Sequence, residues 1–109
     1  MDVAVLGCKQ TVPDDVRALA LEKMAKLGRL NPVLERAEVR MTEERLAAGS
    51  ATRVCEAVLS GHGYTLRAKA AAHDPVVALA MVAGKLGHQV ERLKGKRVAR
   101  SHPRRPRVA

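Results

Sequence analysis

Residues 53–75, RVCEAVLSGHGYTLRAKAAAHDP, decide the fold, because they hold two strand-like runs and the start of a helix. The runs 53–60 and 64–72 are mainly apolar, and in the second run aliphatic residues alternate with Arg67 and Lys69. A short connection with two glycines, GHG, separates the runs, which is typical of a β-hairpin. We therefore predict two antiparallel strands that follow each other along the chain.

A long helix is predicted directly after this hairpin. Asp74 is a suitable N-cap and Pro75 a suitable first helical residue. Aliphatic residues then recur every three or four positions, as on one face of a helix; they are Leu79, Ala83, Leu86, Val90 and Leu93. After Gly95 the pattern gives way to a stretch rich in Lys, Arg and Pro. We therefore predict a domain over residues 1–95 and a basic disordered tail or linker over residues 96–109.

The first half of the chain predicts a strand, a helix and a second strand. Apolar residues within 2–7 indicate the first strand, and Pro13 suits the first turn of a helix that Gly28 would end. The helix has apolar residues at helical spacing, namely Val16, Leu19, Ala20, Met24 and Leu27. In the second strand, 36–44, Ala37, Val39 and Met41 alternate with polar residues, as in a half-buried strand.

These elements together predict one α+β domain with the order β-α-β-β-β-α. The first helix connects the first two strands as a crossover, so we expect those strands to be parallel and the remaining pairs antiparallel. Two helices with one apolar face each can pack on one face of a four-stranded mixed sheet. The opposite sheet face should be polar and carry Arg40, Arg67 and Lys69.

Positive charge is concentrated at the C-terminal end of the chain. The net charge is +9, and residues 85–109 contain nine Lys and Arg against the single acid Glu91. Such asymmetry favours a nucleic-acid or anionic-membrane partner, with a solvated tail as the alternative. The longest apolar run is far too short to cross a membrane, and the N-terminus lacks the pattern of a signal peptide, so we expect a cytoplasmic protein.

Basic residues also follow helical spacing on both predicted helices. We expect them to form one surface that binds RNA, although each set is also compatible with a simple solvated helix face. The candidate RNA-binding residues are Lys23, Lys26 and Arg29 on the first helix, and Lys85, His88, Arg92, Lys94, Lys96 and Arg97 on the second and beyond. Because Tyr64 is the only aromatic residue, contact with phosphates and RNA shape fits better than base stacking.

The sequence contains no recognisable catalytic or cofactor motif. The four histidines lack metal-ligand spacing, no glycine-rich phosphate loop follows a strand, and no serine has a nucleophile-elbow context. We therefore predict that the protein is not an enzyme and uses no cofactor, metal or small-molecule substrate. Cys8 and Cys55 are expected to be free thiols in a reducing compartment, with a disulfide between them left open.

Four segments, in this order, resemble the ribosome hibernation-promoting factor family, also called ribosome-associated inhibitors or sigma-54 modulation proteins. They are DDVRALALEKMAKLGRL, AEVRMTEE, GHGYTLRAKAAAHDP and ALAMVAGKLGHQVERLKGK. The resemblance implies the same β-α-β-β-β-α domain and the same basic residues on the two helices. The chain departs from the family pattern at His88, where the family often has Arg, and at HDPVVAL, where an aromatic residue is common.

The resemblance implies a protein that binds the rRNA of the small ribosomal subunit near the decoding region. By blocking access of mRNA and tRNA, it would silence translation under stress. The sequence leaves a second class of function open, a regulatory module that interacts with a transcription factor or another acidic protein partner.

Overall fold

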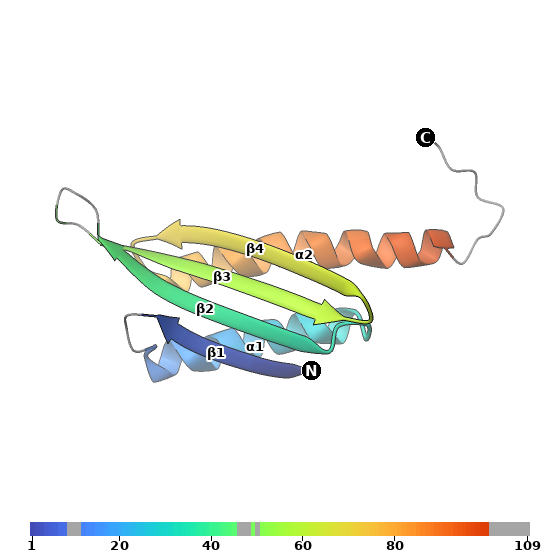
Figure 1. The fold of residues 1–109 in the computed structure, drawn as a ribbon, viewed down its shortest axis with the longest axis horizontal. Coiled ribbons are helices and arrows are strands. Elements are labelled where there is room, and N and C mark those ends of the chain that lie inside the picture. The colour runs from blue at the N-terminus through green and yellow to red at the C-terminus, as the bar shows by residue number, and fades with distance from the viewer. Residues whose placement is uncertain (9–11, 46–48, 50, 101–109) are drawn as a thin grey trace.

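The computed structural model describes residues 1–8, 12–45, 49 and 51–100, and for Cys8 and residues 94–100 it describes only the backbone. The elements follow the predicted order β-α-β-β-β-α, shown in Figure 1. They are β1 (Asp2–Cys8), α1 (Asp14–Leu30), β2 (Arg36–Arg45), β3 (Ala51–Gly61), β4 (Tyr64–Ala72) and α2 (Pro75–Arg100).

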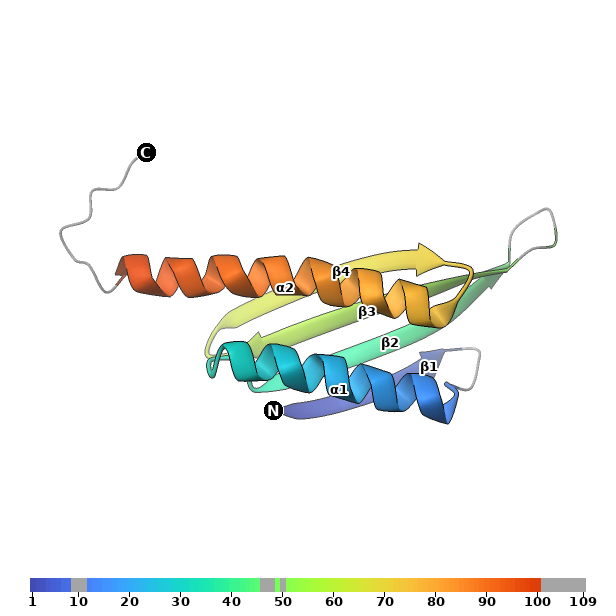
Figure 2. The same ribbon diagram turned by 180° about the vertical axis from the view of Figure 1, so that it is seen from behind.

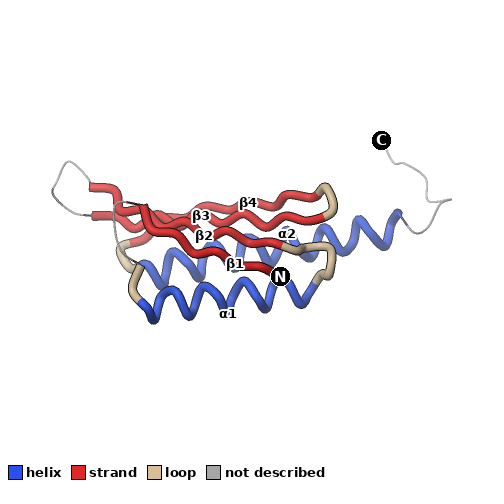
Figure 3. Tube along the Cα trace, turned by 60° about the horizontal axis from the view of Figure 1, so that its bottom comes forward, coloured by secondary structure: helices blue, strands red, loops and turns tan. Residues whose placement is uncertain are grey.

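The four strands form one sheet in the order β1-β2-β3-β4. β1 pairs with β2 in parallel, with Val5 opposite Val39, while β2 pairs with β3 and β3 with β4 in antiparallel. Both helices cover the same face of this sheet, as Figures 2 and 3 show. The predicted α+β class, the strand directions and the two-helix layer are therefore confirmed.

One layer of apolar side chains lies between the sheet and the helices. Ala37, Val39 and Met41 point into it from β2, as their alternation predicted. The largest fully buried side chains come from every layer of the fold; they are Met24, Met41, Leu59, Leu79, Leu86, Val39, Val82, Val90 and Cys55. Of the predicted stripe on α2, only Ala83 is half-buried rather than buried. Removal of this apolar surface from water is the main force that holds the helices on the sheet.

The β3–β4 hairpin closes through a two-residue turn. His62 has φ 48° and Gly63 has φ 82°, and positive φ at both positions is the feature of a type I′ turn. Gly61 stands just before the turn, where the chain entering β2 passes close by. A Cβ atom at Gly61 would collide with the carbonyl oxygen of Val33 and lie 2.8 Å from the nitrogen of Glu35. Only glycine therefore fits at position 61.

The helix ends differ from the sequence prediction at two places. α1 continues past Gly28 to Leu30, and the extended residue Asn31 then accepts a hydrogen bond from the N–H of Val33 at 3.0 Å. The prediction that the last helix ends at Gly95 is wrong, because α2 continues to Arg100. Lys and Arg favour helix, and their charges suit its C-terminal end. The rest of the predicted tail, 101–109, lies outside the described residues.

The start of α2 agrees with the prediction. The side-chain carboxylate of Asp74 accepts a hydrogen bond from the N–H of Val76 at 2.8 Å. The main-chain carbonyl oxygen of Asp74 accepts another from the N–H of Ala78 at 3.1 Å. Asp74 is therefore the N-cap, and Pro75 occupies the first helical position. This cap fixes where the chain leaves β4 and turns onto the helix layer.

Two glycine-to-alanine substitutions should change stability in opposite directions. Gly61→Ala should lower the free energy of unfolding by about 2 kcal/mol, because its methyl group meets backbone that cannot move aside. Gly84→Ala should raise it by up to about 1 kcal/mol, because a Cβ there meets nothing within 4 Å and alanine favours helix. Urea unfolding of both variants measures the difference, and equal effects would contradict the described packing at Gly61.

Cys55 should resist alkylation in the folded protein. Burial raises the pKa of its thiol to about 11, so the reactive thiolate is scarce at neutral pH, and the side chain is fully buried and free of a disulfide. Iodoacetamide labelling followed by peptide mapping should show Cys55 modified only after unfolding in urea. Rapid labelling of native Cys55 at pH 7.5 would contradict this burial.

Candidate nucleic-acid interface

The two helices lie side by side on the sheet and run in the same direction, as Figure 2 shows. A Cβ atom on Gly87 of α2 would lie 4.0 Å from Cδ2 of Leu27 of α1, so these two positions are level with each other. Both helices rise about 1.5 Å per residue. The second half of α1 therefore lies beside the middle of α2, and the two helices start at the same end of the sheet. We call their solvent-facing sides the helix layer.

The candidate residues of α1 occupy its second half. Lys26 and Arg29 are exposed, and Lys23 is half-buried. Lys23 and Lys26 come directly before the buried Met24 and Leu27, and Arg29 comes two residues after Leu27, so all three point to other sides of the helix than the core side. The prediction that this part of α1 presents cations to solvent therefore agrees with the structure.

The candidate residues of α2 start where α1 approaches its end. Lys85, His88 and Arg92 are exposed and, with Gln89 and Glu91, line a shallow hollow. Lys94, Lys96 and Arg97 belong to the helical backbone of α2, but their side chains lie outside the described part. The structure thus brings the described α2 candidates together on one side of the helix.

Two side chains of α2 reach the free edge of β4. The Nζ of Lys85 donates a hydrogen bond to the carbonyl oxygen of Lys69 at 2.9 Å. The side-chain amide of Gln89 donates to the carbonyl oxygen of Arg67 at 2.8 Å and accepts from its N–H at 3.3 Å. Gln89 thus bonds β4 as a neighbouring strand would, which protects the edge from pairing with another chain.

These bonds direct one flank of α2 toward β4 and away from α1. Arg92 is seven residues after Lys85, about two helical turns, so it lies on the same flank. Lys26 and Arg29 belong to α1, which runs along the opposite flank of α2. The basic residues of α1 and those of α2 therefore share one end of the helix layer without lying next to each other. Spacing along the sequence does not distinguish this arrangement from a single basic stripe.

Sequence reasoning missed the two residues that tie helices to sheet edges. One is Gln89, and the other is Arg17, whose Nη1 donates to the carbonyl oxygen of Val5 on β1 at 2.9 Å. Each lies on a helix flank next to an edge strand. The predicted strand order could have pointed to them, because edge strands leave main-chain groups that need partners.

The opposite face of the sheet is polar but of mixed charge. Arg40, Arg67 and Lys69 are exposed there, as predicted. Glu56 pairs across the sheet with both Arg40 and Lys69, and Glu38 lies 3.6 Å from Arg40. Acids therefore accompany the cations on this face, whereas the basic part of the helix layer holds mainly cations.

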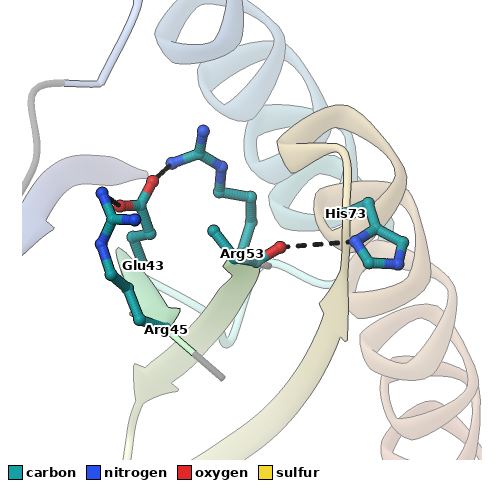
Figure 4. Close-up of polar contacts among 5 residues, drawn as sticks. Glu43, Arg45, Arg53 and His73 are labelled. Atoms are coloured by element: carbon teal, nitrogen blue, oxygen red, sulfur yellow. Dashed lines mark hydrogen bonds and ion pairs between the residues drawn. The ribbon is translucent and has the colours of Figure 1, made fainter. Parts of the chain in front are cut away.

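Another group of charges lies at the end of the sheet, shown in Figure 4. Glu43 contacts Arg53 and lies 3.7 Å from Arg45, so its carboxylate is shared by two guanidinium groups. His73 places its Nδ1 3.3 Å from the carbonyl oxygen of Ala51. Within the described part of the chain, no three His, Cys, Asp or Glu side chains are arranged to hold a metal ion.

Comparison with known families identifies the relatives of this chain. Residues 5–98 match the family described as "Sigma 54 modulation protein / S30EA ribosomal protein". The chain belongs to this family. It is a family of ribosome-associated modulation proteins. Comparison with curated proteins gives no significant match.

Solved structures similar to this member of the family share its fold. A ribosomal subunit interface protein from Coxiella burnetii has a TM-score of 0.73 at 18% identity, over 87% of this chain and 99% of that one. The N-terminal domain of Protein Y from Thermus thermophilus has a TM-score of 0.71 at 22% identity, over 85% of this chain and 99% of that one. Neither described helix of the present protein is long and apolar enough to cross a membrane.

Replacement of Gln89 by alanine should expose the β4 edge of this family member. We expect the free energy of unfolding to fall by about 1–2 kcal/mol, because two main-chain groups of Arg67 lose their partner. The exposed edge should also promote self-association at high concentration. Urea unfolding and size-exclusion chromatography measure the two effects, with His88→Ala as a control on the same turn. A Gln89→Ala variant as stable and monomeric as the control would contradict this role.

Proposed function

We propose that this protein is a ribosome hibernation factor. It binds the rRNA of the small ribosomal subunit near the decoding region and blocks access of mRNA and tRNA. Translation is thereby silenced under stress. Membership of a ribosome-associated family supports the ribosome as the partner.

The observation that carries the proposal is the collection of cations at one end of the helix layer. Lys26, Arg29, His88 and Arg92 are exposed there. Acids do lie nearby: Glu91 on α2, Glu22 one turn before Lys26, and Asp2 and Glu35, which line a hollow with Arg29. In the described part of the chain, however, none of these acids forms an ion pair with the four cations, whereas Glu38 pairs with Arg40 on the opposite sheet face. Cations without an acidic partner attract the phosphates of RNA and release their counterions.

The chain is suited to contact with RNA backbone rather than with stacked bases. Tyr64 is half-buried and packs against the core, so it is not presented as a stacking platform. Lys and Arg on a fixed helical frame recognise the positions of phosphates, which reflect the shape of folded RNA. This mode of binding needs no cofactor and no chemical step, because occupancy alone would exclude mRNA and tRNA.

The candidate residues have different roles in this proposal. Lys26, Arg29, His88 and Arg92 are exposed and would contact phosphates directly. Lys85 is bonded to Lys69 on β4, so it would mainly position α2 and add to the local positive potential. Lys23, Lys94, Lys96 and Arg97 would extend the same basic surface along the two helices.

The test is a pair of matched triple substitutions that each remove three positive charges. Lys26→Gln/Arg29→Gln/Arg92→Gln should weaken binding to purified small subunits by at least about tenfold at 150 mM salt. It should also reduce the slope of log affinity against log salt by about 2–3, because each phosphate contact contributes about 0.7–0.9. Arg40→Gln/Arg67→Gln/Lys69→Gln, on the opposite sheet face, should change the slope by less than about 1.

Fluorescence anisotropy over a salt series measures the affinities, and circular dichroism verifies that both variants are folded. Equal losses for the two triples would sink the assignment of the helix layer. A pull-down from lysate with and without nuclease tests the alternative class of function. A partner that survives RNA digestion would favour a protein-interaction module instead.

A further inference from the structure

The first turns of α2 violate the usual pattern of a surface helix. Residues 76–84 contain no charged side chain, although Val77 is 48%, Met81 44% and Val76 38% exposed. Surface helices normally carry polar residues on the side that faces water, and a helix that is apolar all round is normally buried. We call this exposed side the apolar start of α2; it comprises Val76, Val77, Ala80, Met81 and Gly84. Exposed apolar patches of this kind mark sites of interaction.

Acidic residues of α1 lie at the same end of the helix layer. The level of Leu27 and Gly87 places the first turn of α1 beside the first turn of α2. The exposed Asp14 is three residues before Arg17, so it shares the flank of α1 that faces β1. The exposed Asp15 lies on the other flank, as does the exposed Glu22 seven residues later. In the part of the chain that the structure describes, none of these three carboxylates forms an ion pair.

Among the described side chains, three cations near this end have other partners. Arg17 donates to the carbonyl oxygen of Val5, and Arg45 and Arg53 share the carboxylate of Glu43. The apolar start of α2 is therefore bordered by negative charge on the side of α1. The helix layer thus has an apolar and acidic end, which is followed along the same helices by the basic end.

The chemistry of this end selects its partner. Carboxylates repel RNA phosphates, and no aromatic side chain belongs to α1 or α2 for a base to stack on. A second copy of the chain, paired through this end, would bring two acidic borders together, and their like charges would repel. A protein segment with Lys or Arg beside apolar side chains fits both features, because its cations can meet the carboxylates while its apolar groups cover Val77 and Met81.

We propose that the apolar start of α2, with the acidic border on α1, binds a lysine- or arginine-rich protein segment that carries apolar side chains. This inference rests on the proposed function, since with the basic end on rRNA the segment belongs to a protein of the small subunit. The helix layer then contacts RNA at one end and protein at the other. The second contact adds affinity that does not depend on phosphates.

Site-specific photo-crosslinking on purified small subunits tests the partner. A benzophenone amino acid in place of Val77 should crosslink to a subunit protein, within a peptide rich in Lys or Arg that also contains apolar residues. The same probe in place of His88 should crosslink to rRNA. Crosslinks from position 77 to rRNA, to a peptide without basic residues, or to nothing, would overturn the inference while position 88 still reports the proposed function.

Two pairs of substitutions test the apolar and the acidic contacts separately. Val77→Gln/Met81→Gln should weaken binding to small subunits by about tenfold and leave the salt slope unchanged, because apolar contacts are lost without any change of charge or loss of a phosphate contact. Asp15→Asn/Glu22→Gln should weaken binding by about threefold if the partner is cationic. An RNA partner at this end predicts the opposite sign, because removal of negative charge would then strengthen binding.

Glu38→Gln/Glu44→Gln is the matched control, since it removes two negative charges from β2, away from both ends of the helix layer, and should leave the affinity unchanged. Circular dichroism verifies the fold of each variant. Tighter binding of Asp15→Asn/Glu22→Gln, or unchanged binding of Val77→Gln/Met81→Gln, would overturn the inference. Absence of any binding by the unaltered chain would instead defeat the proposed function, and this inference with it.

Discussion

The burial of one sheet face under two helices that run in the same direction is the constraint on which the rest of the structure depends. Leu79, Leu86 and Val90 of α2 and Met24 of α1 are fully or almost fully buried against that face. Once these side chains point inward, helical geometry directs all the remaining side chains of the two helices outward or toward the neighbouring element. The position of Leu27 opposite Gly87 shows that the two helices are level. The places of the described surface charges on the helix layer follow from these two facts.

The same helix surface contributes to the fold and to the proposed interface. Lys85 and Gln89 stand on the flank of α2 that holds the free edge of β4, and Arg92 follows on that flank one turn later. A cation whose nitrogen is bonded to the main chain has a fixed position, so it shapes the local potential more than it reaches for a ligand. Arg17 holds β1 in a comparable way from α1. Both edge strands thus receive hydrogen bonds from the helices above them, which favours a single sheet over pairing with other chains.

The helix layer is polarised along its length, and the helix dipoles contribute to this. Acids favour the N-terminal turns of helices and cations favour the C-terminal turns. Since α1 and α2 start at the same end of the sheet, these preferences coincide in space instead of cancelling. The lack of charge over residues 76–84 is a separate feature that the dipole does not explain. Together they support the proposal of two partners of different chemistry on one layer, rRNA at the basic end and a cationic protein segment at the other.

The sequence by itself determined the elements of this protein, because short-range periodicity reports which side of a helix or strand is buried. The alternation in β2, the glycine-containing turn before β4 and the Asp74–Pro75 start of α2 were all readable in this way. The end of α2 was not, because the apolar stripe stops before Gly95 whereas the helical backbone continues to Arg100. The tertiary structure alone decided which flank of α2 faces β4 and which faces α1. That choice depends on the distance between elements far apart in the chain, and it separates Lys85 and Arg92 from the α1 cations with which their spacing had grouped them.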